Sequence, residues 1–316
     1  MTPGRWSRHD VLDVDDWSRE EFEMVLSTTE AMREVLDRPI KRTPVLRAKT
    51  VVLFFAEAST RTRVSFELAA KALSADVVNI TTSGSSVEKG ESLLDSVRTL
   101  DALGGDVIVL RHASSGAPYF VADRIDASVV NAGDGWHAHP SQALLDAYTL
   151  RSRLGTLSNK TIAIVGDVLH SRVARSNVHA LRALGADVVL CGPPTLLPAA
   201  WRCGHAPAGV RVETDLARAL EGVDAVMALR LQQERMSAGL LPSTREYARV
   251  WGITEARLAA AKPDAPVLHP GPMNEGVEID AAVAHGPRSV IEEQVTNGVA
   301  VRMALLYLLA GTDVPD

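Results

Sequence analysis

Short apolar runs alternate with stretches of helical periodicity along most of the chain. The run Val-Val-Leu-Phe-Phe at residues 51–55 is typical of a strand that is buried on both faces. Residues 172–184 carry apolar positions at helical spacing and are followed by Gly185, which is typical of a helix C-terminus. Strands that alternate with helices in this way predict parallel sheets covered by helices. The predicted strands cover residues 51–55, 76–80, 107–110, 128–131, 161–165, 187–191, 225–229 and 266–269.

These strands form two sets, one in each half of the chain. At 316 residues the chain also exceeds the size at which a single hydrophobic core stops growing. We therefore predict an α/β fold with two doubly wound parallel-sheet domains. Residues 132–142 are rich in turn formers, and an apolar helix predicted at about 289–309 is expected to return to the first domain. These features predict one domain at residues 1–140 with 295–316 and a second at 141–294.

The strongest candidate site is Ser-Thr-Arg-Thr-Arg at residues 59–63, between the first strand and a predicted helix. A helix N-terminus offers unpaired backbone N–H groups and a partial positive charge. Arginine adds a planar cation that matches the oxygens of a phosphate. A hydroxyl residue here is often only a helix cap, and Thr60 with Arg63 could serve that purpose. Two arginines beside three hydroxyl groups favour a phosphate site over capping alone.

Arginine and histidine residues follow several other predicted strands. Ligands of doubly wound folds bind at the carboxyl ends of the strands. Taken alone, each residue has an ordinary explanation, such as a surface arginine or a histidine that caps the next helix. Their shared location favours substrates with several negative charges. The residues are Arg111, His139, Arg172 and Arg230.

Composition excludes several classes of partner. The net charge of −6 argues against binding to nucleic acid or to an anionic membrane, so the clustered arginines are a local feature. Cys191 and Cys203 lack disulfide or zinc-ribbon spacing and suit a reducing compartment. The N-terminus has no apolar signal segment, and the apolar stretch at 303–310 is too short to span a bilayer. We expect a cytoplasmic protein.

Other site chemistries lack their motifs. The Gly-Asp turn at 166–167 follows a strand as in dinucleotide-binding domains, but no GxGxxG is present. The chain also lacks the GxxxxGK[ST] motif of a phosphate-binding P-loop and the GxSxG motif of a serine nucleophile. His137 and His139 are spaced like a metal-ligand pair, but no convincing further ligand set accompanies them. We predict neither a metal nor a cofactor.

The polar segment at residues 83–92 leaves two interpretations open. A flexible surface loop that ends in a helix cap is the usual explanation for so polar a segment. Alternatively, Ser85 and Lys89 donate hydrogen bonds to a phosphate or a carboxylate.

With these motifs, nearly the whole chain resembles the aspartate/ornithine carbamoyltransferase family. The resemblance implies an enzyme that transfers the carbamoyl group of carbamoyl phosphate to the amine of L-aspartate. The products would be N-carbamoyl-L-aspartate and phosphate, in an early step of pyrimidine biosynthesis. The motifs are Ser-Thr-Arg-Thr-Arg at 59–63, Lys-Gly-Glu at 89–91, Arg-His at 111–112, His-Pro-Ser-Gln at 139–142, Gly-Asp at 166–167 with Arg172, Arg-Leu-Gln-Gln-Glu-Arg at 230–235 and His-Pro-Gly-Pro at 269–272.

The resemblance also implies which residues bind carbamoyl phosphate. The expected catalytic residues are Arg61, Thr62, Arg111 and His139. Of these, Arg111 and His139, with help from Thr62, would bind the carbonyl oxygen. The full expected set is Ser59, Thr60, Arg61 and Thr62 at the phosphate, Arg111 and His139 at the carbonyl oxygen, and Gln142, Pro270 and Gly271 at the carbamoyl nitrogen, with Pro272 beside them.

The aspartate site implied by the resemblance uses a second set of residues. Its members are Lys89, Arg172, Arg230 and Gln232. Ser85 and Lys89 would come from a neighbouring subunit, which makes a homotrimer the smallest active unit. A regulatory chain or a dihydroorotase partner stays open.

Aspartate is favoured over ornithine because Arg172 and Arg230 suit a dicarboxylate and would repel a cationic side chain. Ornithine enzymes of the family typically carry a cysteine in a His-Cys-Leu-Pro loop, where this chain has Pro-Gly at 270–271. Ala113 and Glu275 depart from the family pattern, in which a proline and a basic residue are common, and neither is assigned to substrate. Two rivals stay open: a non-enzymatic scaffold, which usually loses such motif residues, and a transcarbamoylase for another amine.

Overall fold

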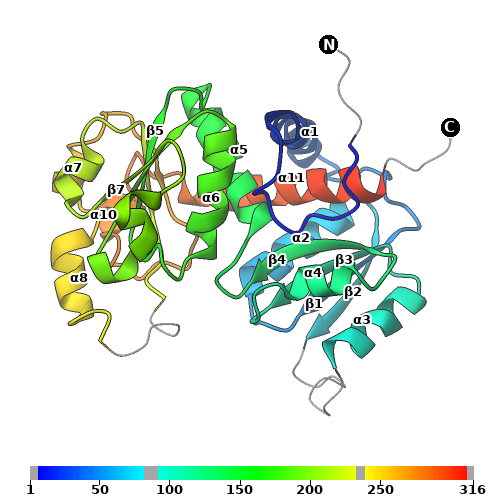
Figure 1. The fold of residues 1–316 in the computed structure, drawn as a ribbon. Coiled ribbons are helices and arrows are strands. Elements are labelled where there is room, and N and C mark those ends of the chain that lie inside the picture. The colour runs from blue at the N-terminus through cyan, green and yellow to red at the C-terminus, as the bar shows by residue number, and fades with distance from the viewer. Residues whose placement is uncertain (1–5, 82–91, 233–238, 312–316) are drawn as a thin grey trace. The chain divides into compact units, whose positions relative to one another are not determined.

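The computed structural model describes residues 6–81, 92–232 and 239–311 (Figure 1). The chain forms two compact units. The first comprises the chain up to Leu145 and the residues from Thr296 onward, and the second comprises Asp146–Val295. The boundaries fall within two helices, α5 (Pro140–Leu154) and α11 (Ile291–Ala310). Among the helices that the structure describes, none is long and apolar enough to cross a membrane.

The first unit contains a parallel sheet in the order β2-β1-β3-β4. All the strands predicted for this half of the chain are confirmed. A hydrogen bond from Arg302 of α11 to the Ser65 hydroxyl (3.1 Å) joins the end of the chain to α2 within this unit, and a second from Arg302 to the Gly298 carbonyl (2.9 Å) lies within α11. Its elements before α5 are α1 (Arg19–Asp37), β1 (Thr50–Phe55), α2 (Thr60–Ala72), β2 (Asp76–Thr81), α3 (Leu93–Ala102), β3 (Val107–His112), α4 (Ala117–Ala122) and β4 (Ser128–Asp134).

The second unit contains a parallel sheet in the order β7-β6-β5-β8-β9. The predicted strands are again found, but β9 is shorter than predicted. The edge strand β7 was not predicted. Its elements between α5 and α11 are β5 (Thr161–Val165), α6 (Arg172–Ala183), β6 (Asp187–Cys191), η2 (Pro194–Leu196), η3 (Trp201–His205), β7 (Val210–Glu213), α7 (Leu216–Leu220), β8 (Ala225–Ala228), α8 (Thr244–Trp251), α9 (Glu255–Leu258), β9 (Val267–Leu268) and α10 (Ala281–Ala284).

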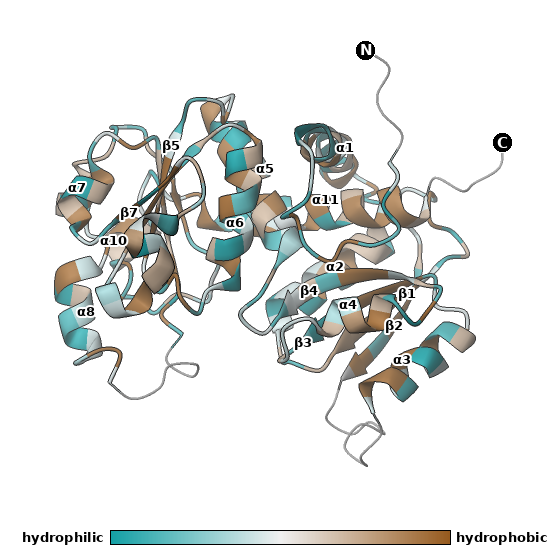
Figure 2. Ribbon diagram, viewed as in Figure 1, coloured by the Kyte–Doolittle hydropathy of each residue, from teal (hydrophilic) through white to brown (hydrophobic). Residues whose placement is uncertain are grey.

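Burial of the strands explains why both sheets form. After a half-buried first threonine, every residue of β1 and β5 is buried. Figure 2 shows hydrophobic residues along the strands and alternating hydrophobic and hydrophilic residues on surface helices such as α3 and α8. Phe54 and Ile108 belong to the core of the first unit, and Val165 and Val226 belong to that of the second. Removal of these side chains from water is the main driving force for each unit.

An ion pair and a main-chain hydrogen bond hold the amino ends of β1 and β3 together. The Lys49 ammonium lies 3.0 Å from Oδ1 of Asp106, the residue before β3. The other carboxylate oxygen of Asp106 accepts the Thr50 N–H at 2.7 Å. The pair therefore fixes how the two central strands of the sheet begin.

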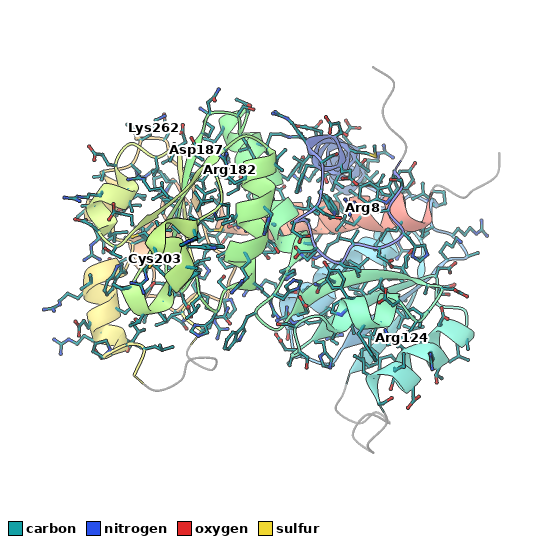
Figure 3. The ribbon with its side chains drawn as sticks, in the orientation of Figure 1. Arg8, Arg124, Arg182, Asp187, Cys203 and Lys262 are labelled. Carbon is teal, nitrogen blue, oxygen red and sulfur yellow. The ribbon has the colours of Figure 1, made fainter. Side chains whose placement is uncertain are left out.

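The second unit repeats this arrangement at β5 and β8. Oδ2 of Asp224, the residue before β8, accepts the Thr161 N–H at 3.0 Å. Its Oδ1 lies 3.3 Å from the Lys160 ammonium and accepts a hydrogen bond from Lys262 at 2.8 Å. Figure 3 shows Lys262 and Asp187, the first residue of β6, at the same end of this unit. In both sheets, therefore, the aspartate before one strand pairs with the lysine before the central strand and accepts the first N–H of that strand.

Candidate active site

The loop after β1 brings the predicted phosphate-binding residues to the N-terminus of α2. Ser59 is the N-cap residue, and its side chain makes no capping hydrogen bond. Thr60 and Arg61 are exposed in the first turn, whereas Thr62 is buried. This first turn contains no acidic residue, so no carboxylate of its own competes for the N–H groups of the helix end. The turn can therefore bind an oxyanion.

The two arginines of this turn differ in their surroundings. Arg63 lies 3.8 Å from a carboxylate oxygen of Glu67, one helical turn further on. The same carboxylate accepts a hydrogen bond from Lys71 at 2.6 Å, and this bond lowers the pKa of Glu67. Arg63 is thus part of a row of charges along α2. Arg61, the other arginine of this turn, is exposed beside the helix end.

Arg111 stands at the end of β3 with its guanidinium oriented by protein groups. Its side chain is 11% exposed. Nη1 donates to the Ala132 carbonyl at 3.1 Å, and Nη2 donates to the Glu57 carboxylate at 2.5 Å. Arg111 pairs with Phe55, the last residue of β1, so its strand end lies beside the strand that leads to Ser59. A cation held in this way is pre-organised to stabilise negative charge that develops on a substrate.

His139 and Gln142 lie at the start of α5, after β4. The His139 carbonyl accepts hydrogen bonds from the N–H groups of Gln142 (3.0 Å) and Ala143 (3.2 Å), with Pro140 as the first helical residue. These main-chain hydrogen bonds are the first of the helix and fix the backbone of His139 at its start. His139 and Gln142 are both buried. Because β3 and β4 are neighbours, these residues share the sheet edge with Arg111.

His137, the other histidine of this segment, is paired with Asp134. Its Nδ1 lies 3.1 Å from Oδ2 of Asp134, and this hydrogen bond raises the pKa of His137. Burial alone would raise the pKa of Asp134, but hydrogen bonds from His137, Asn131 and Gly116 outweigh it and lower that pKa. His137 thus has a structural partner. Among the residues that the structure describes, no cluster of three or more His, Cys, Asp or Glu is arranged to hold a metal ion.

In the second unit, Arg172 is the first residue of α6, after β5. The helix is capped by Ser171, whose hydroxyl accepts the Ala174 N–H at 3.1 Å. Arg172 is only 4% exposed. A buried guanidinium at a helix N-terminus favours an anionic ligand, because the helix end itself is positive.

Arg230 and Gln232 follow β8 and are half-buried. The Leu229 N–H donates to the Val165 carbonyl at 2.8 Å, which keeps this segment beside the end of β5. A backbone hydrogen bond from Gln232 to the Asp167 carboxylate continues the contact. Arg172, Arg230 and Gln232 therefore gather at one edge of the second sheet.

Asp167 and His170 support the same edge. Nδ1 of His170 lies 2.8 Å and 3.0 Å from the two carboxylate oxygens of Asp167. Burial raises the pKa of Asp167, and its contact with His170 opposes that shift only in part. Both side chains are buried, so the pair fixes the turn between β5 and α6.

The turn at Pro270, Gly271 and Pro272 follows β9, the neighbour of β8. Gly271 has a φ of 62°, a conformation that favours glycine. Its N–H donates to Nδ1 of His269 at 2.7 Å, and Nε2 of His269 lies 3.2 Å from Glu278. This turn shares the sheet edge with Arg230 and Gln232.

Sequence reasoning missed the residues that orient these groups. Glu57 follows the first strand and could have been suspected for that reason. Glu278 and Gln294 carry no local signal, because they are nine and 25 residues from the His269 groups that they contact. Ser85, Lys89 and residues 233–235 lie outside the described residues.

Two family models match the chain. The carbamoyl-P binding domain of aspartate/ornithine carbamoyltransferase matches residues 9–152, and the Asp/Orn binding domain of that family matches residues 158–309. The chain is 61% identical to the aspartate carbamoyltransferase catalytic subunit of Chloroflexus aurantiacus over 305 residues, which cover 96% of this chain and 99% of the relative. It is 58% identical to the corresponding subunit of a Roseiflexus species over 306 residues, 96% of each chain.

Solved structures of the two acceptor classes are similar to this fold. Aspartate transcarbamoylase from Trypanosoma cruzi, in complex with N-(phosphonacetyl)-L-aspartic acid, has a TM-score of 0.86 at 29% identity and covers 96% of each chain. Ornithine carbamoyltransferase from Pyrococcus furiosus has a TM-score of 0.88 at 26% identity and covers 98% of this chain and 100% of its own. Backbone shape therefore does not separate the two acceptors, whereas sequence identity favours aspartate.

Proposed function

The chain belongs to the aspartate/ornithine carbamoyltransferase family, and from that premise we propose how its two sheet edges divide the work of the reaction. The enzyme transfers the carbamoyl group of carbamoyl phosphate to the amine of L-aspartate and releases N-carbamoyl-L-aspartate and phosphate, a step of pyrimidine biosynthesis. The observation that carries this assignment is the 61% identity to an aspartate carbamoyltransferase catalytic subunit across nearly both chains.

The first unit binds carbamoyl phosphate. The phosphate lies at the N-terminus of α2, where it accepts hydrogen bonds from the helix N–H groups and is neutralised by Arg61. The open cap at Ser59 supports this role, because the Ser59 hydroxyl is not engaged as a capping group. The phosphate-binding residues are Ser59, Thr60, Arg61 and Thr62.

Arg111 and His139 bind the carbonyl oxygen of the carbamoyl group, with help from Thr62. Negative charge develops on this oxygen as the amine attacks, so donors fixed in advance lower the barrier. The ion pair that orients Arg111 and the main-chain hydrogen bonds that fix the backbone of His139 support these roles. The carbamoyl nitrogen is met by Gln142, Pro270 and Gly271, with Pro272 beside them.

The second unit binds L-aspartate. Arg172, Arg230 and Gln232 hold its two carboxylates, with Lys89 contributed by a neighbouring subunit. Two guanidiniums at one sheet edge match a dicarboxylate and repel the ammonium group of ornithine. The burial of Arg172 strengthens both effects, since charges interact more strongly where water is excluded.

Carbamoyl phosphate already carries a good leaving group, so the reaction needs no covalent enzyme intermediate. The aspartate nitrogen attacks the carbonyl carbon, a C–N bond forms, and the C–O bond to phosphate breaks. The departing phosphate takes the proton that the amine loses. The protein contributes by placing the two substrates together and by stabilising the oxyanion.

A cytoplasmic homotrimer is the proposed form of the enzyme, with Ser85 and Lys89 of one subunit completing the site of the next. Exposed apolar residues of the first unit support association: Val64 and Leu68 on α2 are 39% and 52% exposed, and Val78 on the edge strand β2 is 39% exposed. An exposed edge strand beside exposed apolar side chains is a surface on which another chain can pack. The mass of the native enzyme in solution tests the trimer and whether a regulatory chain or a dihydroorotase joins it.

The test is carbamoyl transfer by the purified full chain, with L-aspartate and L-ornithine assayed side by side, with and without EDTA. Turnover with aspartate alone, unaffected by EDTA, is expected. Turnover with ornithine would reassign the acceptor and require another role for Arg230. A folded trimer that turns over neither amine would favour a missing partner chain or a scaffold role.

A further inference from the structure

The turn after β9 has no backbone N–H to offer a ligand. Pro270 and Pro272 lack an N–H altogether. The N–H of Gly271, which lies between them, is used inside the protein, since it donates to Nδ1 of His269 at 2.7 Å. The other polar main-chain groups of this turn are carbonyl oxygens, which only accept hydrogen bonds.

The ring of His269 is held in the state that accepts this N–H. Its side chain is 0% exposed, and Nε2 lies 3.2 Å from Oε1 of Glu278, which is 1% exposed. Because Gly271 donates to Nδ1, the ring proton sits on Nε2 and is donated to Glu278. The Asn274 N–H (2.6 Å) and Nδ2 (3.2 Å) donate to the same carboxylate and fix its position.

The main chain of His269 is fixed as well. Its N–H donates to Oε1 of Gln294 at 3.0 Å, and Nε2 of Gln294 donates to Asp146 at 2.7 Å. The other carboxylate oxygen of Asp146 accepts from Asn177 on α6 at 2.8 Å. Gln294, Asp146 and Asn177 are all buried, so His269 is held from two sides by a network that is closed to water.

We propose that His269 is a specificity-determining residue that makes this turn an acceptor-only surface for the carbamoyl NH2 group. The inference rests on the proposed function, in which the turn meets the carbamoyl nitrogen. An amide-type NH2 group donates two hydrogen bonds and accepts none, so it requires carbonyl oxygens and is opposed by a free N–H. An acyl phosphate with a methyl group in the same place has no hydrogen to donate. His269 therefore helps the enzyme to distinguish carbamoyl phosphate from acetyl phosphate.

A matched pair of variants tests this inference. His269→Leu and His269→Asn are similar in size, and both remove the ring contact with Glu278. Only the asparagine carries an oxygen that can accept the N–H two residues further along. The measurement is kcat/KM for carbamoyl phosphate and for acetyl phosphate at saturating L-aspartate. Where acetyl phosphate is turned over too slowly, its inhibition constant against carbamoyl phosphate replaces kcat/KM.

In His269→Leu we expect kcat/KM for carbamoyl phosphate to fall about 30-fold, the size of one or two lost hydrogen bonds with a donor left facing the ligand. The value for acetyl phosphate should change less than about 3-fold, because its methyl group loses no hydrogen bond. His269→Asn should keep most of the selectivity. If His269 has a purely structural role, kcat/KM should fall equally for both substrates, or the selectivity should change equally in both variants. Either result overturns the inference.

Circular dichroism and trimer mass establish that each variant is folded. If His269→Leu does not fold, Glu278→Met carries the test, because it leaves His269 in place but removes the acceptor that keeps the ring proton on Nε2. A narrowed selectivity in Glu278→Met supports the inference, and unchanged selectivity overturns it. Failure of the unaltered chain to use L-aspartate would instead contradict the proposed function.

Discussion

The two units use one sheet design twice. In each, parallel strands follow the same spatial order, β2-β1-β3-β4 in the first and β6-β5-β8-β9 in the second. On one side of the central strand, Arg111 lies near the end of β3 in the first unit, and Arg230 follows β8 in the second. A His-Pro pair follows the next strand, at 139–140 and at 269–270. Each unit thus presents a cation and a histidine-containing turn at the carboxyl edge of its sheet.

The units differ at the helix that follows the central strand. Ser59 of α2 makes no capping hydrogen bond, whereas Ser171 of α6 caps its helix with its hydroxyl. The arginines at these two helix ends differ in exposure, because Arg61 is exposed whereas Arg172 is only 4% exposed. In the proposed function, the open helix end at Ser59 binds the phosphate with its N–H groups, and Arg172 binds a carboxylate of L-aspartate with its side chain. The difference in helix capping matches the two anions proposed for the two units.

The largest expected effect comes from Arg111→Met. Loss of the cation at the developing oxyanion should lower kcat about 10²- to 10³-fold, while KM for L-aspartate changes little. Arg63→Met is the matched control, because Arg63 lies in an ion pair on α2, and it should change kcat less than about 3-fold. The double variant Arg111→Met with Glu57→Gln avoids an unpaired carboxylate. Steady-state kinetics in which Arg111→Met stays within about 5-fold of the unaltered protein would remove Arg111 from the reaction.

Arg230→Gln tests whether the second edge is dedicated to aspartate. Loss of a charge-assisted hydrogen bond should raise KM for L-aspartate about 30-fold, while KM for carbamoyl phosphate stays within about 3-fold. Initial rates at varied concentrations of each substrate give both constants. An unchanged KM for L-aspartate would contradict the assignment of Arg230 to that substrate. A larger rise in KM for carbamoyl phosphate would contradict the proposal that each unit binds one substrate.

Most of the fold follows from the sequence because the central strands are almost entirely apolar. The short apolar runs at residues 51–55 and 161–165 predict buried strands, and the structure confirms both. The edge strand β7, with the sequence Val-Arg-Val-Glu and no fully buried residue, has no such pattern and was missed. Burial on both faces leaves a signal in the sequence, whereas pairing at an exposed edge leaves little.

The candidate site was predictable only where its residues form local motifs. Ser59 and Arg172 stand at helix starts directly after strands, so sequence position alone places them at a sheet edge. The contacts that hold His269, from Glu278 and Gln294, join segments that meet only after folding. No periodicity or spacing in the sequence predicts these contacts. Sequence reasoning therefore finds the groups proposed to touch substrate more readily than the groups that orient them.

Replacing each N-cap serine by alanine sharpens the difference in capping. Ser171→Ala should lower the free energy of unfolding by about 1 kcal/mol, because it removes the hydrogen bond to the Ala174 N–H. Ser59→Ala should lower it by less than about 0.5 kcal/mol, since that bond is absent, but should raise KM for carbamoyl phosphate about 10-fold. Urea denaturation and steady-state kinetics measure the two effects. If both variants lose equal stability, the first helix end is capped like the second.

The smallest expected effect concerns how stability changes with pH at two similar Asp-x-x-His pairs, Asp134 with His137 and Asp167 with His170. The two aspartates should change the pH dependence of stability in opposite directions. The folded-state pKa of Asp134 is lowered from 3.8, because hydrogen bonds outweigh burial, so its stabilising contribution is present above that value and is lost as pH falls through the folded pKa. The folded-state pKa of Asp167 is raised from 3.8 by burial, so its ionisation opposes folding as pH rises above that value.

The Asn variants at these two positions should therefore respond to pH in opposite ways. Relative to the unaltered protein, Asp134→Asn should lose stability as pH rises from acid toward neutrality, whereas Asp167→Asn should gain it, because an amide at 167 has no charge to bury. Urea denaturation at a series of pH values between about 3 and 7 measures both differences across the range in which carboxylates titrate. Differences of the same sign would mean that the two pairs share one environment. Opposite signs would mean that hydrogen bonds determine the pKa of Asp134, whereas burial determines that of Asp167.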